Sequence, residues 1–155
     1  MSDLEQQIID CDEEERLLVF EEFSNEDALE LGLEIVQEAK RRGVSVTVDI
    51  ERTGQKLFHH AMESTSPDND EWIRRKCNVV RRTFKSSFHV GLILKRDGVS
   101  IRDKYFLDPM EYSAHGGCFP LTLRGTGVVG TIAVSGLPQA EDHRLVVSVI
   151  RSRLK

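Results

Sequence analysis

The motif with the clearest chemical content is HGGCFP, in the second half of the chain. It consists of His115, Gly116, Gly117, Cys118, Phe119 and Pro120. Paired glycines let a backbone take positive φ angles or approach a ligand closely, and successive N–H groups in such a turn can hold an anion. Two glycines are also typical of an ordinary tight turn. The motif therefore predicts a turn before a strand, with an anion site as its functional hypothesis.

His115 and Cys118 together raise a second hypothesis, a cysteine nucleophile assisted by a histidine. The thiolate is the reactive form, so a neighbouring group must lower the thiol pKa. A spacing of three residues in a turn does not ensure that the imidazole reaches the sulfur, and no third orienting group is indicated. The alternatives are an enzyme of unknown reaction that uses Cys118 or His115, and a buried, inert cysteine.

The spacing of histidines and cysteines does not support metal binding. His59 and His60 are adjacent on an expected strand and point to opposite faces, so they cannot share one ion from there. The five histidines show neither HxH nor HExxH spacing, and the three cysteines form no close pair in sequence. We predict no metal site and no disulfide, and this use of cysteine fits a reducing compartment.

Positive charge is concentrated in one segment, where it could meet an anion. The cationic residues are Arg74, Arg75, Lys76, Arg81, Arg82 and Lys85. Aromatic residues make up only 6 % of the chain and none is interleaved with these bases as a stacking pair, so nucleic acid is disfavoured. The segment instead predicts contacts with small carboxylates or with acidic residues of this or another subunit.

A second anion site is conceivable where the segment VSGLPQ, residues 134–139, precedes Asp142 and His143. This order places a strand end, a glycine and a helix N-terminus together. Free N–H groups at a helix N-terminus attract anions, although capping by Ser135 or Gln139 would explain the sequence equally well.

The charges are divided unevenly along the 155 residues. The net charge is −5, but residues 1–30 contain 12 acidic residues and one basic residue, whereas the remainder contains 14 acidic and 20 basic residues. The acidic segment, taken as residues 1–23, can be a solvated face, a cover for a basic surface, or one half of a subunit contact.

Hydrophobic periodicity and caps predict the elements that position these residues. Helices are expected over 2–11, 24–42 and 66–85, and from 138 onward, with Ser24 and Ser66 as N-caps. Gly32 within the second helix predicts that this helix packs closely on a sheet. Strands are expected over 17–20, 44–51, 56–61, 89–95, 99–105, 121–123 and 128–134, with the four acids at 12–15 breaking the first helix. The turn at residues 52–55 and the Asp97-Gly98 pair indicate hairpins between strands. Hairpins, rather than regular βαβ units, predict an antiparallel sheet flanked by helices, an α+β fold in one domain spanning 1–155.

Other classes of protein are disfavoured by what the sequence lacks. No GxGxxG or Walker loop stands between an expected strand and an expected helix, so a nucleotide-binding fold has no motif support. The N-terminus has no basic start followed by an apolar run, and nowhere do 18 apolar residues follow one another. We therefore expect a cytoplasmic protein with no membrane partner.

Several motifs together resemble one family over nearly the whole chain. They are Phe23-Ser24 with Leu31-Gly32, Ser66-Pro67-Asp68-Asn69 with Trp72 to Lys76, Ser86-Ser87, the HGGCFP motif, and VSGLPQ with Asp142-His143. Through these motifs the sequence resembles the haem-degrading-domain family of the GlcG/HbpS superfamily, which also includes the C-terminal domain of PduO. The resemblance implies a profilin-like sheet, a closed homo-oligomer, and haem or a corrinoid as the ligand of some members.

From the residues and the resemblance together we expect a small-ligand-binding module, with haem or another anionic ligand held around the HGGCFP turn. The candidate ligand-binding residues are Lys76, His115, Gly116, Gly117, Cys118, Phe119, Asp142 and His143. The alternatives are the enzyme described above and a protein-interaction scaffold whose acidic N-terminus docks a partner.

Overall fold

The structure is a computed structural model that describes residues 2–155, which form six helices and four strands. The helices are α1 (Asp3–Leu17), α2 (Asn25–Arg41), α3 (Pro67–Thr83), α4 (Ser87–Asp97), α5 (Ile101–Tyr105) and α6 (Gln139–Arg153). The strands are β1 (Thr47–Arg52), β2 (Gln55–Ala61), β3 (Cys118–Leu123) and β4 (Gly127–Ser135). Within this described part of the chain, no helix is both long and apolar enough to cross a membrane.

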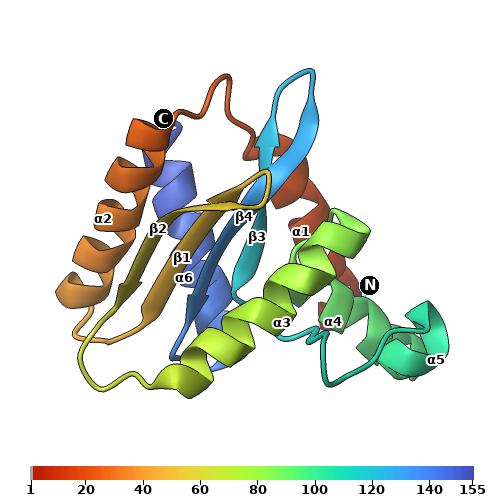
Figure 1. Ribbon diagram of the computed structural model, residues 1–155. Coiled ribbons are helices and arrows are strands. Elements are labelled where there is room, and N and C mark those ends of the chain that lie inside the picture. Colours follow the sequence, from red (N-terminus) through yellow and green to blue (C-terminus); the bar gives the residue numbers. More distant parts are fainter. Residues whose placement is uncertain (1) are drawn as a thin grey trace.

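The four strands form one antiparallel sheet in the order β2-β1-β4-β3 (Figure 1). Two hairpins, β1–β2 and β3–β4, meet where β1 pairs with β4. In the register, Ile50 of β1 stands opposite Phe58 of β2 and Ile132 of β4. The predicted α+β class with an antiparallel sheet and flanking helices is confirmed.

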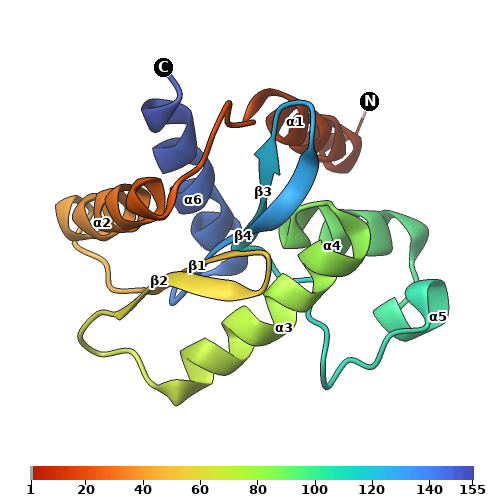
Figure 2. The same cartoon turned by 45° about the horizontal axis from the view of Figure 1, so that its top comes forward.

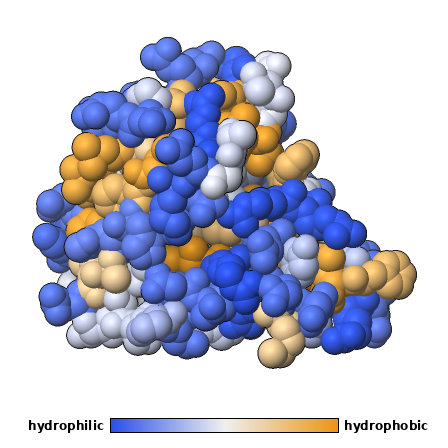
Figure 3. Space-filling view, viewed as in Figure 1, coloured by the Kyte–Doolittle hydropathy of each residue, from blue (hydrophilic) through white to orange (hydrophobic). Residues whose placement is uncertain are grey.

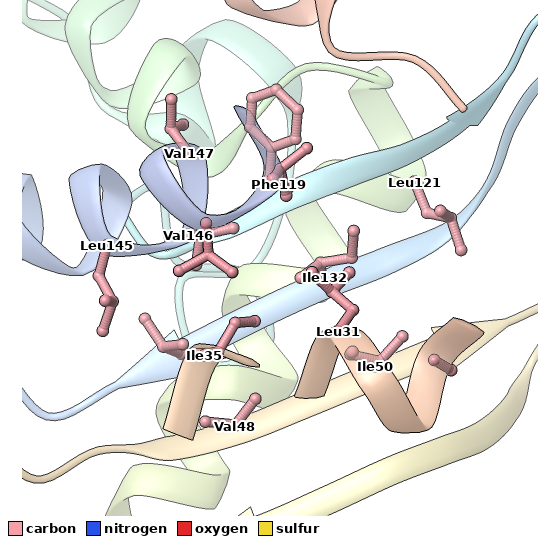
Figure 4. Packing of buried hydrophobic residues seen from close by; sticks show 14 of the residues in the cluster. Leu31, Ile35, Val48, Ile50, Phe119, Leu121, Ile132, Leu145, Val146 and Val147 are labelled. Atoms are coloured by element: carbon pink, nitrogen blue, oxygen red, sulfur yellow. The ribbon is translucent and has the colours of Figure 1, made fainter. Parts of the chain in front are cut away.

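The main hydrophobic core lies between the sheet and the pair α2 and α6, which cover the same face (Figure 2). Alternate residues of β1, β3 and β4 point into it, as the period-two pattern requires. In Figure 4, Leu31 and Ile35 of α2 lie over Val48, Ile50 and the neighbouring strands. This core fixes the sheet on which the remaining helices are placed.

Gly32 lets α2 approach the sheet closely. A Cβ atom at this position would lie 2.3 Å from the Phe58 ring of β2, so any larger side chain would force the helix away from the strand. Close packing is the reason expected for this glycine, which otherwise lowers helix propensity by about 1 kcal/mol relative to alanine. The structure confirms that expectation.

The opposite face of the sheet is covered by α3, which buries residues that a one-sided sheet would leave to solvent (Figure 2). Thr47 and Asp49 of β1 are both buried there, although they alternate with the valines and the isoleucine of the core face. A small apolar cluster, comprising Ile73, Cys77, Val80, Cys118 and Ala133, joins α3 to β3 and β4. The site residues of α3 are therefore held against the strand ends.

Two predicted strands are wrong, because residues 89–95 and 99–105 belong to helices α4 and α5. Ser86 caps α4, and its Oγ accepts a hydrogen bond from the backbone N–H of His89. Gly98 ends the helix in the left-handed conformation, a common C-terminal cap. The Asp97-Gly98 pair that indicated a hairpin is thus the end of a helix.

The first helix is longer than expected and passes through the four acids at 12–15. It packs against α4, with Ile8 and Cys11 buried beside Leu92. The strand expected over 17–20 is also wrong in extent, because Phe20 forms only an isolated parallel bridge with Leu123. The acidic segment is therefore partly a cover over the body of its own chain.

Candidate functional site

A hollow of about 410 Å³ lies where α3, the end of β4 and the start of α6 meet. We call it the polar hollow. Its lining residues are Asp68, Asn69, Trp72, Lys76, His115, Ser135, Gly136, Leu137, Gln139 and Asp142. Three candidate residues from distant parts of the sequence, Lys76, His115 and Asp142, are thereby brought together.

Lys76 and Asp142 form a buried ion pair at the base of the polar hollow. Lys76 is 3 % exposed and Asp142 is 1 % exposed, and Lys76 Nζ lies 3.2 Å from Asp142 Oδ2. The ammonium also donates to the Val134 carbonyl at 3.2 Å, and Asp142 Oδ1 accepts from the Leu137 N–H at 3.0 Å. Burial raises the pKa of Asp142 to about 6, and the nearby ammonium opposes this rise only in part. The positive charge of Lys76 is therefore compensated by a carboxylate of the same chain.

The glycines of the HGGCFP turn are required by close packing. Gly117 has a φ of 134°, and a Cβ atom there would lie 2.5 Å from the Val134 carbonyl oxygen and 2.7 Å from Lys76 Nζ. The Gly116 N–H donates to Gln139 Oε1 at 3.0 Å. The turn thus holds the buried lysine and the start of α6 in place.

His115 is held between an aromatic ring and a hydroxyl group. Its Nδ1 is hydrogen-bonded to Ser113 Oγ at 3.0 Å, and its ring meets Trp72 edge-on at a centroid distance of 5.1 Å. The Arg75 guanidinium lies over the Trp72 ring, 4.3 Å from the ring centroid. Burial lowers the pKa of His115, and the positive charges of Lys76 and Arg75 lower it further. The imidazole is therefore neutral near pH 7.

A second hollow, of about 580 Å³, lies on the other side of Trp72 and His115. We call it the aromatic hollow. Besides Trp72, His115 and Gln139, its lining includes the rings of Phe88 and Tyr112 and the cationic side chains of Arg75 and Lys95. Apolar walls with a few charged groups are typical of a small-molecule site. His115 borders both hollows.

Sequence reasoning missed Trp72 and Ser113 as parts of a site. Trp72 precedes Lys76 by four residues on α3, and residues at this spacing lie on one helix face. That spacing could have placed the tryptophan beside the lysine. Gln139 belongs to the VSGLPQ segment, but its side chain accepts from the Gly116 N–H and does not cap α6.

We expect the pKa of His115, measured by an NMR titration of the imidazole, to lie below its ordinary value of 6.5. Replacement Arg75→Gln should raise it, because a neighbouring positive charge is removed. Arg82→Gln, on an exposed part of α3, is the matched control and should leave it unchanged. Because the unfolded chain binds this proton more readily, stability should rise with pH up to about 6.5 and then be unaffected by this group. A His115 pKa above 6.5 would contradict the assignment.

Cys118 and Phe119 lie outside both hollows. Cys118 is fully buried, with its Sγ 3.2 Å from Cys77 Sγ, and burial raises its pKa well above the ordinary thiol value. A thiol with a raised pKa is a poor nucleophile. Phe119 is part of the main core. The geometry therefore favours the inert cysteine over the nucleophile.

His143 also lies apart from the polar hollow, although its neighbour Asp142 lines it. The imidazole is stacked on Phe88 at a centroid distance of 4.7 Å and is covered by α1. Its Nε2 is hydrogen-bonded to Glu14 Oε1 at 2.8 Å. His143 thus faces the acidic segment.

A third hollow, of about 260 Å³, lies between the β1–β2 hairpin and α3. In Figure 3 the centre of this face shows apolar atoms surrounded by hydrophilic side chains. Asp49 accepts from Lys56 Nζ at 2.5 Å and is hydrogen-bonded to His59 Nδ1 at 2.8 Å. His59, rather than His60, therefore shares the polar face of the hairpin with Asp49. His59 Nε2 also lies 3.2 Å from Asp70 Oδ1 of α3, so this network joins the hairpin to α3.

Comparisons with known proteins agree with this architecture. The chain is 48 % identical over 143 residues to a UPF0303 protein of Streptomyces coelicolor, which covers 92 % of this chain and 90 % of that protein. The solved structure of the Ybr137w protein is similar, with a TM-score of 0.86, 29 % identity and coverage of 96 % of this chain and 90 % of that one. The structure of a PduOC–haem complex has a TM-score of 0.69 at 16 % identity, covering 84 % and 94 %.

The model of one protein family matches residues 23–151, which include the whole sheet and every residue that lines the polar hollow. Its description is haem degrading protein, HbpS-like. Helix α1 lies before the matched segment. The chain belongs to the HbpS-like family of haem-degrading proteins.

Proposed function

We propose that this protein is a binding module for a flat, anionic ligand of the tetrapyrrole type, held in the aromatic hollow with His115 at its edge. The observation that carries the proposal is the position of His115, a neutral imidazole that borders two hollows beside Trp72 and Arg75. Membership of a haem-degrading family, and the haem complex of the similar PduOC protein, support the choice of ligand class.

The residues present fit a haem group. Imidazole nitrogen is a common axial ligand of haem iron. The His115 Nδ1 is hydrogen-bonded to Ser113, so Nε2 is the ring nitrogen that can ligate a metal. Arg75 and Lys95 would pair with the carboxylates of the ligand, and the rings of Trp72 and Phe88 would lie against its apolar surface. Bound haem would supply an iron centre whose visible absorption reports its ligation.

The proposal retains the expected cytoplasmic location and homo-oligomeric assembly. All three cysteines are free and buried, which is consistent with a reducing compartment. It does not require catalysis by Cys118, whose sulfur packs against Cys77 rather than facing a hollow. Binding of a ligand is the function that the site geometry supports best.

Haem titration followed by the Soret band tests this function. The wild-type protein is expected to show a saturable shift at one haem per chain. His115→Ala should abolish the shift and weaken binding at least about tenfold, a loss of about 1.4 kcal/mol or more. His60→Ala, which removes an exposed histidine on β2, is the matched control and should bind haem as the wild type does.

Metal-free protoporphyrin IX separates recognition of the flat ring from ligation of the iron. If the site is correctly assigned, His115→Ala should weaken haem binding much more than protoporphyrin binding, because only haem uses the imidazole as a ligand. Arg75→Gln should weaken both. The proposal is wrong if the wild type gives no saturable shift, or if His115→Ala and His60→Ala behave alike.

A further inference from the structure

A cluster of three different metal-ligating side chains lies away from both hollows, between α1 and α6. Cys11 and Glu14 are three residues apart on α1 and share one helix face, and His143 stands in the first part of α6. One ligand atom from each residue, the thiol sulfur, a carboxylate oxygen and a ring nitrogen, lies within 4.8 Å of the other two. Two segments separated by most of the chain thus present sulfur, oxygen and nitrogen to one point.

The histidine of this cluster is not satisfied by the protein alone. His143 is only 4 % exposed, and Phe88 and Phe119 lie against its ring. Its Nε2 is hydrogen-bonded to Glu14, whereas Nδ1 is buried without a hydrogen-bond partner among the atoms of residues 2–155. Buried polar atoms in native proteins nearly always have a partner. Because Nε2 is the ring nitrogen that faces Glu14, it is the atom that an ion beside this carboxylate and the buried thiol would use, and Nδ1 needs a separate partner.

The charge around the cluster also favours a cation. Cys11 is only 2 % exposed and lies on a helix whose residues 10–15 include Asp10, Asp12, Glu14 and Glu15. The one nearby base of this segment is Arg16 at the helix end. Asp10 and Asp12 are exposed, so the negative charge that is shielded from solvent beside Cys11 is that of the half-buried Glu14 and Glu15, and a divalent cation would neutralise it.

We propose that Cys11, Glu14 and His143 bind a zinc-type transition-metal ion that ties α1 to α6. Thiolate, imidazole and carboxylate are the protein ligands of zinc, while calcium and magnesium prefer oxygen alone. Three protein ligands leave a fourth position for water, the arrangement of an open zinc site. On binding, the Cys11 thiol gives its proton to solvent and its sulfur bonds to the metal.

A neighbouring group, Asp12, Glu15 and His89, is a useful contrast. These side chains also lie within 4.8 Å of one another, but they offer no sulfur, and Asp12 is exposed. His89 Nδ1 is hydrogen-bonded to Glu15 at 2.9 Å, and Glu15 also accepts from the Ser86 N–H. These two contacts of Glu15 fix α1 on α4 and account for the group without a metal ion. The metal is therefore assigned to the cluster that contains Cys11.

The proposed ion would connect α1, which lies outside the segment matched by the family model, to α6, which begins within it. Residues 23–151 match the family model, and α1 lies before them. Metal binding would then fix the acidic helix over Phe88, which also lines the aromatic hollow. The proposal does not depend on haem binding, because none of its three ligands lines either hollow.

Cobalt and zinc titrations of the full chain, purified without a histidine tag, test the site. The wild type is expected to bind one Co²⁺ per chain with a thiolate-to-cobalt charge-transfer absorption, and zinc should displace it. Cys11→Ala should remove the absorption and weaken zinc binding at least about tenfold, since even outer-shell partners of metal ligands contribute about ten- to a hundredfold. Glu14→Gln, which can keep a hydrogen bond to His143, should also weaken zinc binding.

Cys77→Ala is the matched control, because Cys77 is equally buried but lies on α3. It should leave the cobalt spectrum unchanged. Peptide mapping after alkylation of the native protein adds a test in the wild type: zinc should slow labelling of Cys11 more than that of Cys77, because only the Cys11 thiol bonds to the ion. Absence of stoichiometric binding, or retention of the charge-transfer absorption in Cys11→Ala, would overturn the proposal.

Discussion

Replacement of Lys76 by methionine is expected to lower the free energy of unfolding by about 3–5 kcal/mol, the usual cost of leaving a buried charge without its partner. Lys76 and Asp142 are both almost fully buried and contact each other at 3.2 Å, so solvent screens this pair very little. Methionine keeps most of the volume of the lysine stem, so the loss reports the charge rather than a cavity. Urea denaturation followed by circular dichroism measures it.

The double variant Lys76→Met, Asp142→Asn separates the pair from the surrounding packing. The asparagine can still accept the hydrogen bond from the Leu137 N–H but has no charge to bury. We expect it to recover a large part of the stability lost in Lys76→Met, since removing both charges avoids the unpaired carboxylate. A double variant as unstable as the sum of the two single variants would show that the ion pair does not couple these residues.

Local patterns in the sequence were sufficient to predict most of the fold. The alternation of valines in β1, the Thr53-Gly54 turn and the Ser24 and Ser66 caps each depend on neighbouring residues only, and all are present in the structure. Gly32 was also interpreted correctly, because a glycine within a strong helical pattern needs a packing reason. Such features can be predicted because their causes lie within a few residues.

Helix α4 could not be distinguished from a strand by the same means. Val90, Leu92 and Leu94 alternate with other residues as in a strand, yet His89, Val90, Leu92 and Ile93 are the ones that are buried in the helix. A short apolar run fits both periods, and a glycine after an aspartate ends a hairpin strand or a helix equally well. The packing of α4 against α1 and β3 decides between them.

The candidate site was only partly predictable, because its contacts join distant residues. The motif HGGCFP places His115 at the polar hollow, and the close approach of Gly117 to Lys76 and Val134 could not be predicted from the motif. The Cys77–Cys118 contact and the Lys76–Asp142 pair are separated by 41 and 66 residues. Contacts between residues so far apart in the sequence cannot be predicted from the spacing of a motif.

The prediction of no metal site stays a prediction, and it was made from local spacing alone. It rested on the spacing of histidines and of cysteines within the sequence, and the cluster at Cys11 and Glu14 gains its histidine from α6, more than a hundred residues later. The acidic residues 12–15 were expected to interrupt a helix. In the structure, two of them, Glu14 and Glu15, instead hold α1 against His143 and His89.

Replacement of Gly117 by alanine is expected to lower the free energy of unfolding by about 2–5 kcal/mol, because backbone strain and overpacking add. Its φ of 134° is a conformation that residues with a side chain rarely adopt. The new methyl group would also lie 2.5 Å from the Val134 carbonyl oxygen and 2.7 Å from Lys76 Nζ. The variant should therefore disturb the buried ion pair, and denaturation with urea measures the loss.

Gly125→Ala is the matched control, because Gly125 also has a positive φ, 78°, but nothing lies within 4 Å of the position a Cβ would take. It should cost only about 1–2 kcal/mol, the strain of a left-handed conformation without any clash. The difference between the two variants reports the close approach of the HGGCFP turn to Val134 and Lys76, together with the rarer φ of Gly117. If the two losses are equal, the turn does not depend on that close approach, and the glycine is present for its backbone conformation alone.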